Sequence, residues 1–372
     1  MVANSADMIS SKEHIAREFP LVKPYEIGER RRLIDKIPEN YVLLKMIVAG
    51  ICGSDVLYFK GYKEKWKLEK RLPICLLHEG VAEVVETKGE TSVKPGDKVV
   101  IMPLTACGEY IACKMKLGEN LCLNPKFLAS TCDGLARTLL VYPASKVIPI
   151  PEKLDLRIAV LTEPLSAVLN AIEVSNLSGN EKIAIIGDGT IGYLLASTLS
   201  RFFKVQREDL HVIGVVEEKL SIFEDIAEVI NVHKEHEKLR ELKNRLDIVF
   251  EAVGGKAHEK TIDQALDLLR PAGKLVILGI PGEEKTPIRV QKIVSKSLIV
   301  KGSFWSRMDH FKKALNLLKD KEFQKMMKRT ISGKSFKIRE PHDLENALRY
   351  ADSEAGAASR FPGRILVYLN EA

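Results

Sequence analysis

Three side chains that can bind zinc occur within the first eighty residues of the chain, namely Cys52, His78 and Glu79. A thiolate, an imidazole and a carboxylate are all zinc ligands, and a catalytic zinc keeps one coordination position open for water or substrate. The same residues are also compatible with a buried cysteine beside a histidine–glutamate pair on the surface. The residue types alone therefore indicate a candidate metal site and leave both interpretations open.

A second candidate site is the stretch Gly187-Asp188-Gly189-Thr190-Ile191-Gly192, which follows the apolar run KIAII and precedes a helical pattern. The first glycine of such a turn permits a tight bend, the second lets the backbone approach a pyrophosphate, and the third permits close packing of helix on strand. The amino end of the helix also attracts the charge of the phosphates. The order of strand, turn and helix predicts dinucleotide binding rather than a purely structural turn.

Composition excludes several other classes of protein. The six cysteines all lie in the first 132 residues, at Cys52, Cys75, Cys107, Cys113, Cys122 and Cys132. The N-terminal stretch MVANSADMISSKEH lacks the apolar core of a secretory signal, so metal binding or burial is favoured over a disulfide framework. No apolar run approaches the ~18 residues of a membrane helix, and the net charge of +7 over 372 residues is too mild to predict nucleic-acid binding. We therefore expect a cytoplasmic protein with no membrane or nucleic-acid partner.

The elements that must position the first candidate site are predicted to be short strands. Residues 41–49 (YVLLKMIVA) are apolar and partly β-branched, residues 81–87 alternate in part, and PGDKVVIMP contains a Pro-Gly turn. Further short strands are expected between residues 137 and 150. Several short strands separated by Gly and Pro predict a small, barrel-like all-β unit up to about residue 150.

The pattern changes at Thr162, where TEPLSAVLNAIEVS has apolar residues at helical spacing. From there strands and helices alternate, which predicts a doubly wound parallel sheet. We expect strands at 182–186, 210–213, 247–251, 274–279 and 297–302, and helices at 191–203, from about 220, and at 257–269. From about Met308 the pattern predicts two or three amphipathic helices and a last strand, RILVYL.

Taken together, these stretches resemble the zinc-dependent medium-chain dehydrogenase/reductase superfamily, which includes alcohol and sorbitol dehydrogenases. The resemblance rests on AGICGSD, HEGVAEVVE, PGDKVV, TEPLSAV, IIGDGTIG, EAVGG and PGRILVYL, in this order along nearly the whole chain. It implies an α/β protein with a GroES-like β-rich catalytic domain, residues 1–164 and 308–372, and an inserted Rossmann domain, residues 165–307. It also implies an active site between the two domains and a homodimer or homotetramer.

The resemblance assigns the catalytic zinc to particular residues. Cys52, His78 and Glu163 take the positions of zinc ligands, and Glu79 takes a position that is itself a ligand in polyol dehydrogenases. Leu77 replaces the glycine that the family usually has before the histidine. We expect this departure to alter packing rather than ligation.

The resemblance also assigns the proton transfer and the cofactor. Ser54 takes the position of the hydroxyl that relays the substrate proton, although a serine beside a glycine is also compatible with a simple turn. The catalytic residues are therefore expected to be Ser54 and Glu79. The residues assigned to cofactor binding are Gly187, Asp188, Gly189, Thr190, Ile191, Gly192, Gly214, Val253, Gly279, Ile280 and Arg364.

A second, structural zinc of the family is held by four cysteines in a C-x2-C-x2-C-x7-C lobe. Here Cys107 and Cys113 keep the outer spacing, Tyr110 stands where a middle cysteine belongs, and Cys122 comes one residue late. Either three thiolates and Glu109 bind zinc, or the lobe has lost its metal and is held by packing. A closed structural site needs four good ligands, which favours the metal-free lobe.

Within the superfamily, the stretches LPICLLHEGVAEVV, GDGTIGY, FEAVGG and KGSFWSR resemble those of ribulose-5-phosphate reductases. This implies zinc-dependent hydride transfer between NAD(P)H and a sugar or polyol carbonyl, with ribulose 5-phosphate to ribitol 5-phosphate as the leading reaction. Residues 60–71 carry six cations and two acids, which is compatible with a phosphate clamp or with a solvated loop. The alternatives are a general polyol, sugar or alcohol dehydrogenase and, more remotely, a non-catalytic nucleotide- or nucleic-acid-binding relative.

The cofactor preference depends on where the second parallel strand ends. In NAD-specific enzymes a carboxylate about 20 residues after the glycine motif binds the ribose 2′-hydroxyl. If the strand ends at Ile213, the diagnostic position is Gly214, 22 residues past Gly192, and no carboxylate repels a 2′-phosphate. If it runs to Val216, the position is Glu217, 25 residues past, and NAD is preferred. The nearer spacing favours Gly214 and hence NADP(H) over NAD(H).

Overall fold

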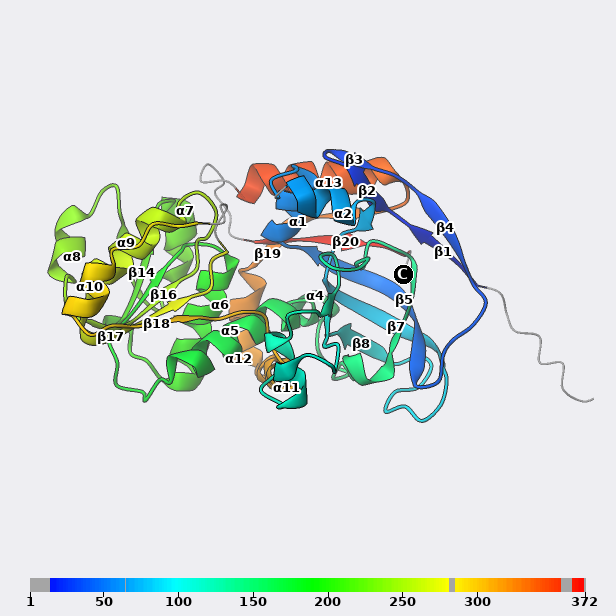
Figure 1. Cartoon of the computed structure of the whole chain (residues 1–372), viewed down its shortest axis with the longest axis horizontal. Coiled ribbons are helices and arrows are strands. Elements are labelled where there is room, and N and C mark those ends of the chain that lie inside the picture. The colour runs from blue at the N-terminus through cyan, green and yellow to red at the C-terminus, as the bar shows by residue number, and fades with distance from the viewer. Residues whose placement is uncertain (1–13, 64, 281–284, 356–362, 371–372) are drawn as a thin grey trace, which may run out of the picture.

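The structure of the chain is a computed structural model, which describes residues 14–63, 65–280, 285–355 and 363–370. Its two largest β-sheets lie side by side, one built from both ends of the chain and the other from its middle (Figure 1). The first contains seven strands and the second six. This arrangement confirms the predicted combination of a β-rich part and a parallel-sheet part.

The seven-stranded sheet is mostly antiparallel and has the order β12-β8-β7-β5-β20-β19, with β11 also paired to β5. Its strands are β5 (Tyr41–Ile51), β7 (Glu79–Thr87), β8 (Lys98–Ile101), β11 (Leu139–Pro143), β12 (Val147–Pro149), β19 (Ile331–Lys337) and β20 (Arg364–Tyr368). The last strand pairs with the central strand β5, so the two ends of the chain complete one sheet. That pairing brings the start of β20 beside the end of β5.

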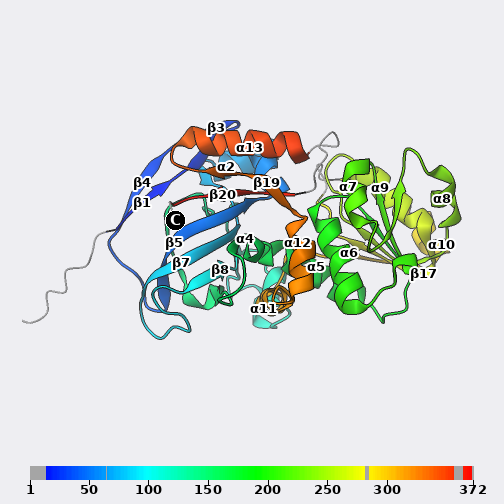
Figure 2. The same ribbon diagram turned by 180° about the vertical axis from the view of Figure 1, so that it is seen from behind.

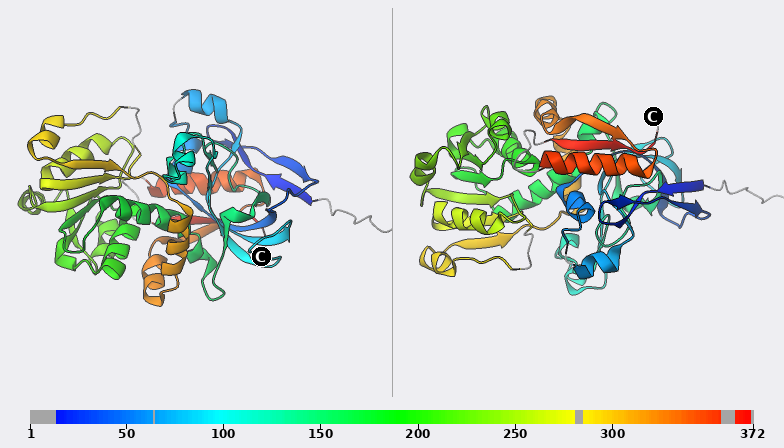
Figure 3. Two further views of the ribbon diagram at one scale, coloured as in Figure 1. Left: turned by 60° about the horizontal axis from the view of Figure 1, so that its bottom comes forward. Right: turned by 90° about the horizontal axis from the view of Figure 1, so that it is seen from above.

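Smaller elements surround this sheet. The short strands are β1 (His14–Glu18), β2 (Pro20–Lys23), β3 (Glu26–Ile27), β4 (Arg30–Ile34), β6 (Ile74–Cys75), β9 (Leu104–Thr105) and β10 (Lys126–Phe127). The helices are α1 (Gly53–Phe59), α2 (Lys65–Arg71), α3 (Ile111–Lys114), α4 (Leu156–Ala159) and α13 (Pro341–Ala355). Helix α13 lies over β19 and β20 and contacts α1, as the view from above shows (Figure 3).

The six-stranded sheet is parallel throughout and has the order β15-β14-β13-β16-β17-β18. Its strands are β13 (Ile183–Ile186), β14 (Leu210–Gly214), β15 (Glu228–Asn231), β16 (Leu246–Glu251), β17 (Leu269–Ile277) and β18 (Ile299–Gly302). Its helices are α5 (Thr162–Ser175), α6 (Thr190–Phe203), α7 (Glu217–Leu220), α8 (His236–Glu241), α9 (His258–Leu268) and α10 (Val290–Ser295). The strand order reverses at β13, as expected for a doubly wound sheet.

Apolar side chains from both faces of the parallel sheet are buried under helices. Ile183, Ile185 and their neighbours pack on α5 and α6, whereas Ala184 and Ile186 face the side that α9 covers. Helices α11 (Met308–Leu317) and α12 (Lys321–Lys328) pack on α5 and α6. Helix α5 contacts both β7 and β17 and so bridges the two sheets (Figure 2).

The structure differs from the predicted elements at several places. The helix expected from about residue 220 is the short α7, followed by a 3-10 turn at Ser221–Phe223. Strand β15 and helix α8 were not predicted, because both are short and α8 buries no residue. Strand β19 was also missed, because ISGKSFK is mostly exposed and becomes a strand by pairing with β20. No helix in the described part of the chain is long and apolar enough to span a membrane.

Candidate active site

Cys52 lies where the central strand β5 turns into helix α1. Its backbone N–H donates to the Asp55 carboxylate at 2.9 Å, which fixes the start of the helix. The other oxygen of Asp55 accepts the N–H of Leu77 at 2.9 Å. One buried carboxylate therefore ties the segment that carries Cys52 to the segment that carries His78.

His78 and Glu79 stand at the start of β7, beside the end of β5. His78 Nδ1 is 3.8 Å from an Asp55 oxygen, and His78 Nε2 is 4.0 Å from Glu79 Oε1. The sulfur of Cys52 and one ligand atom each of His78 and Glu79 all lie within 4.8 Å of one another. The fold thus brings three of the four predicted zinc ligands together from the ends of two neighbouring strands.

Arg364 is the positive charge of this cluster. Its Nε is 2.8 Å from Glu79 Oε2, and its side chain and that of Glu79 are buried. A Cβ at Gly50 would lie 2.8 Å from the same carboxylate oxygen, so only glycine leaves room for this pair. The sequence analysis assigned Arg364 to the cofactor, and the structure places it against Glu79; a cofactor contact stays a prediction.

The electrostatics of the cluster suit a divalent cation. Burial by itself would raise the pKa of the Cys52 thiol. The charge of Arg364 and a hydrogen bond with His78 outweigh burial and lower this pKa to about 6. Burial raises the pKa of Glu163 to about 7 and that of Glu79 well above its usual range. Glu79 Oε1 is buried and has no hydrogen-bond partner among the described residues. A cation here would favour the charged forms of all three groups, so the donor set fits zinc.

Glu163 stands apart from the other three candidate ligands. It lies in the first turn of α5 and is not part of the group whose ligand atoms are within 4.8 Å. His78 and Cys52 nevertheless act on its pKa, which places its carboxyl at the edge of the same cluster. Its ligation of zinc stays a prediction.

Leu77 has a φ of +72°, the left-handed conformation that glycine adopts without strain. Holding a bulky residue there costs about 1–2 kcal/mol. The side chain is fully buried in the apolar core, which contributes about 1.5–3 kcal/mol. The two effects are of similar size, so the core compensates for the backbone strain beside His78.

The glycine turn lies at the carboxyl end of β13. Gly187 has a φ of +136°, and a Cβ at Gly192 would lie 2.0 Å from the Gly187 carbonyl oxygen. The first glycine therefore makes the bend and the last permits the helix to pack on the strand. Gly189 precedes α6 and has open space around it, as an approaching phosphate requires.

Asp188 has a structural contact that sequence reasoning did not anticipate. Its Oδ2 accepts the N–H groups of Val215 and Val216 at 2.8 and 2.9 Å. A Cβ at Gly214 would lie 2.6 Å from the same oxygen. Gly214 thus leaves the space that the Asp188 carboxylate fills. Strand β14 ends at Gly214, so it does not run on to Val216.

The other predicted cofactor residues lie in two loops that contact each other. Gly255 donates its N–H to the carbonyl of Ile280 at 2.8 Å, and a Cβ at Gly279 would lie 2.4 Å from Gly254 N. Val253 and Ile280 are both partly exposed. These loops follow β16 and β17, next to the glycine turn at the same edge of the sheet. Their contact with a cofactor stays a prediction.

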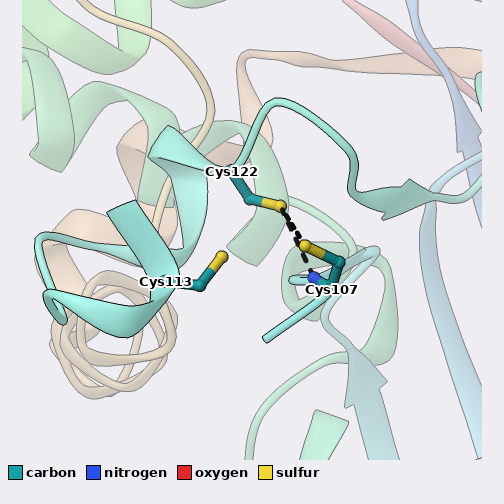
Figure 4. A group of neighbouring side chains, drawn as sticks. All are labelled: Cys107, Cys113 and Cys122. Carbon is teal, nitrogen blue, oxygen red and sulfur yellow. Dashed lines mark hydrogen bonds between the residues drawn. The ribbon is translucent and has the colours of Figure 1, made fainter. Parts of the chain in front are cut away.

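The three cysteines of the predicted structural-zinc lobe lie close together. The sulfurs of Cys107, Cys113 and Cys122 lie within 4.8 Å of one another and point toward a common space (Figure 4). The thiol of Cys122 donates to the Cys107 sulfur at 3.4 Å. Within the described residues the Glu109 carboxylate is not part of this group. The geometry therefore provides three donors and leaves both interpretations of the lobe open.

The basic segment is partly committed to structural contacts. Lys60 pairs with Asp352 at 2.8 Å, and Arg71 donates to the carbonyl of Thr131 at 3.0 Å. Arg71 is the last residue of helix α2, and Lys70 beside it is exposed. Both ends of the segment are therefore held by contacts within the chain, and a phosphate clamp stays a prediction.

Sequence reasoning missed one residue of the site and one pairing. Asp55 is part of the AGICGSD stretch, and its spacing of three from Cys52 is a capping signal that could have found it. The pairing of Arg364 with Glu79 gave no sequence signal, because 285 positions separate the two residues.

Comparison with known families gives two matches. Residues 38–152 match the alcohol dehydrogenase GroES-like domain, and residues 209–320 match the zinc-binding dehydrogenase family. The first match contains Cys52, His78 and Glu79, and the second contains the strands from β14 to β18 and helix α11.

Individual dehydrogenases and reductases are also similar to this chain. Ribulose-5-phosphate reductase 1 of Staphylococcus aureus is 29% identical over 82% of this chain and 86% of its own length. Sorbitol dehydrogenase of Bacillus subtilis is 29% identical over 73% of this chain and 77% of its own length. The crystal structure of Staphylococcus aureus TarJ in complex with NADPH has a TM-score of 0.77 at 24% identity, over 96% of this chain and all of that one.

Proposed function

Because the chain belongs to the zinc-binding alcohol dehydrogenases, we propose that it reduces ribulose 5-phosphate to ribitol 5-phosphate with NADPH at a catalytic zinc. The observation that carries this proposal is the Cys52–His78–Glu79 donor cluster with its buried Arg364, in a chain that also has a glycine turn on a parallel sheet. The relatives named ribulose-5-phosphate reductase support the substrate. A cytoplasmic location and a homodimer or homotetramer belong to the same proposal.

Cys52, His78 and Glu79 would hold the zinc, with Glu163 sharing or alternating in the remaining protein position. When bound there, zinc would supply a Lewis acid for the carbonyl oxygen of the ketose, a role worth several kcal/mol, and the nicotinamide would supply the hydride. The protein orients both reactants and keeps the site dry. Arg364 balances the charge of Glu79 so that two buried carboxyls and a thiolate can share one site.

Ser54 is proposed to carry the proton of the substrate oxygen. It lies in the first turn of α1, two residues after Cys52, and is half-buried. We expect Ser54→Ala to reduce turnover about 100-fold and to leave zinc bound, because it removes a positioned proton relay. Metal analysis and the pH profile of kcat check this, and a rate like that of the parent at every pH would reduce Ser54 to a turn residue.

The cofactor is proposed to be NADP(H). Strand β14 ends at Gly214, the next two residues are valines, and Glu217 begins α7 with its carboxylate paired to Lys234. The Asp188 carboxylate is already engaged by two backbone N–H groups. The end of β14 therefore offers neither Asp188 nor Glu217 as an unengaged carboxylate for a ribose 2′-hydroxyl. This favours NADP(H), the cofactor that carries a 2′-phosphate.

We expect kcat/KM with NADPH to exceed that with NADH at least tenfold, which corresponds to about 1.4 kcal/mol of transition-state free energy. The measurement is the ratio of the two efficiencies at one substrate concentration range. A tenfold preference for NADH would contradict the assignment and would place Glu217 or Asp188 on the ribose.

The substrate is tested with a panel of ketoses and ketose phosphates. We expect ribulose 5-phosphate to be reduced with the highest kcat/KM, and ribulose itself much more slowly, because a charged phosphate gives strong hydrogen bonds to Lys and Arg. Equal or better turnover of ribulose or fructose would favour the second candidate, a polyol dehydrogenase. That candidate is supported by the sorbitol dehydrogenase relative, whose identity to this chain is also 29%.

A further inference from the structure

Four rings follow one another from the metal cluster to the surface. The His78 ring lies 5.5 Å from that of Phe127, Phe127 stacks on Trp305 at 4.5 Å and 9°, and Trp305 lies 4.0 Å from Phe304. His78 and Phe127 are buried, whereas Phe304 is 46% exposed. Trp305 therefore occupies the middle of an aromatic wall whose inner end is a proposed zinc ligand.

The backbone at Trp305 is strained. Its φ is +49°, a conformation that bulky residues rarely adopt. Such a residue persists only where its surroundings hold it in place, and such strain clusters at functional sites. The contacts of residues 303–308 therefore decide where the Trp305 ring lies.

One set of these contacts comes from α5. The hydroxyls of Ser166 and Ser306 are 2.7 Å apart, and Asn170 Nδ2 donates to Ser303 Oγ at 3.0 Å. The same helix carries Glu163 in its first turn. The segment that holds Trp305 thus runs along the helix that reaches the metal cluster.

The other set comes from the lobe formed by residues 107–122. Asn120 Nδ2 donates to the carbonyl of Phe304 at 3.0 Å, and Glu119 Oε1 accepts the N–H of Met308 at 2.7 Å. Both residues lie in a 3-10 turn directly before Cys122. The three-cysteine lobe therefore contacts the backbone on both sides of Trp305.

Only the N–H group of the Asn120 side-chain amide is hydrogen-bonded in the described part of the chain. The side chain is 5% exposed, and its Oδ1 has no hydrogen-bond partner among the described residues. A buried carbonyl without a partner costs about 1–3 kcal/mol, which offsets what the bond to Phe304 contributes. Asn120 therefore adds little net stability, and what its bond constrains is the Phe304 carbonyl, which also accepts a longer bond from Asn170 Nδ2 at 3.4 Å.

We propose that Asn120 is a positioning residue through which the three-cysteine lobe sets the Trp305 ring beside Phe127 and His78, and thereby the affinity for the substrate. The claim about substrate affinity rests on the proposed function. The claim about the ring position does not, because it concerns contacts within the chain alone.

The test uses the fact that the chain has two tryptophans. In a Trp66→Phe background, Trp305 is the only tryptophan, and every variant is compared with that parent. We expect Asn120→Leu to shift Trp305 emission to longer wavelength and to raise its quenching by acrylamide. We also expect KM for the ketose to rise about fivefold or more with kcat little changed. Zinc content and Tm should stay as in the parent, since an orphaned carbonyl is removed together with one bond.

Asn180→Ala is the matched control, because Asn180 is an exposed asparagine ahead of β13. It should change neither the emission nor KM. An Asn120→Leu variant with the emission of the parent, or with its KM, overturns the proposal, as does an equal change in Asn180→Ala. If the parent reduces only unphosphorylated ketoses, the proposed function fails, and the KM comparison is made with that ketose instead.

Discussion

Replacing Cys52 with serine should remove zinc and activity together. The Cys52 sulfur is the only cysteine sulfur in the donor cluster, and a thiolate is a strong ligand for zinc. A Lewis-acid contribution of about 4 kcal/mol corresponds to roughly a 10³-fold loss of turnover. Metal analysis of the purified variant and steady-state kinetics measure the two effects.

Cys132→Ser is the matched control for this experiment. Cys132 is a partly buried cysteine that belongs to none of the groups of possible metal ligands in the described part of the chain. Zinc content and turnover should therefore stay close to those of the parent. Full zinc content and full turnover in Cys52→Ser would contradict the site assignment, whatever the substrate.

Replacing Arg364 with methionine should destabilise the protein by up to about 3–5 kcal/mol, because it leaves the buried Glu79 carboxyl without its charge partner. Protonation of that carboxyl, whose pKa burial already raises, limits the loss. Methionine keeps most of the side-chain volume, so the effect comes mainly from the charge. Urea unfolding of the metal-free protein measures the loss, and zinc titration measures how far added metal restores stability.

Two further variants separate charge from packing. Adding Glu79→Gln to Arg364→Met should recover part of the lost stability, since no unpaired charge remains. Arg157→Met removes an arginine from the exposed pair with Asp155, which should cost no more than about 1 kcal/mol. Equal losses in Arg364→Met and Arg157→Met would mean that the buried pair has no special role.

The sequence by itself determined most of the regular elements of the parallel sheet, although not β15 or α8. Helix α5 covers the residues that the TEPLSAVLNAIEVS pattern predicts, and β13, the glycine turn and α6 follow as expected. These signals are local, because hydrophobic periodicity and glycine at a tight bend depend on residues a few positions apart. The motif resemblance pointed to Cys52, His78 and Glu79 in the same way, since each lies in a short stretch of the sequence, AGICGSD or HEGVAEVVE.

Only the tertiary structure decided which of these residues act together. Arg364 meets Glu79 because β20 pairs with the end of β5, and Asn120 meets Phe304 because the lobe packs on a segment 184 positions away. Strand β19 exists because β20 lies beside it, not because of its own pattern. Contacts at such separations depend on how whole elements pack, and a single sequence carries no local periodicity that reports them.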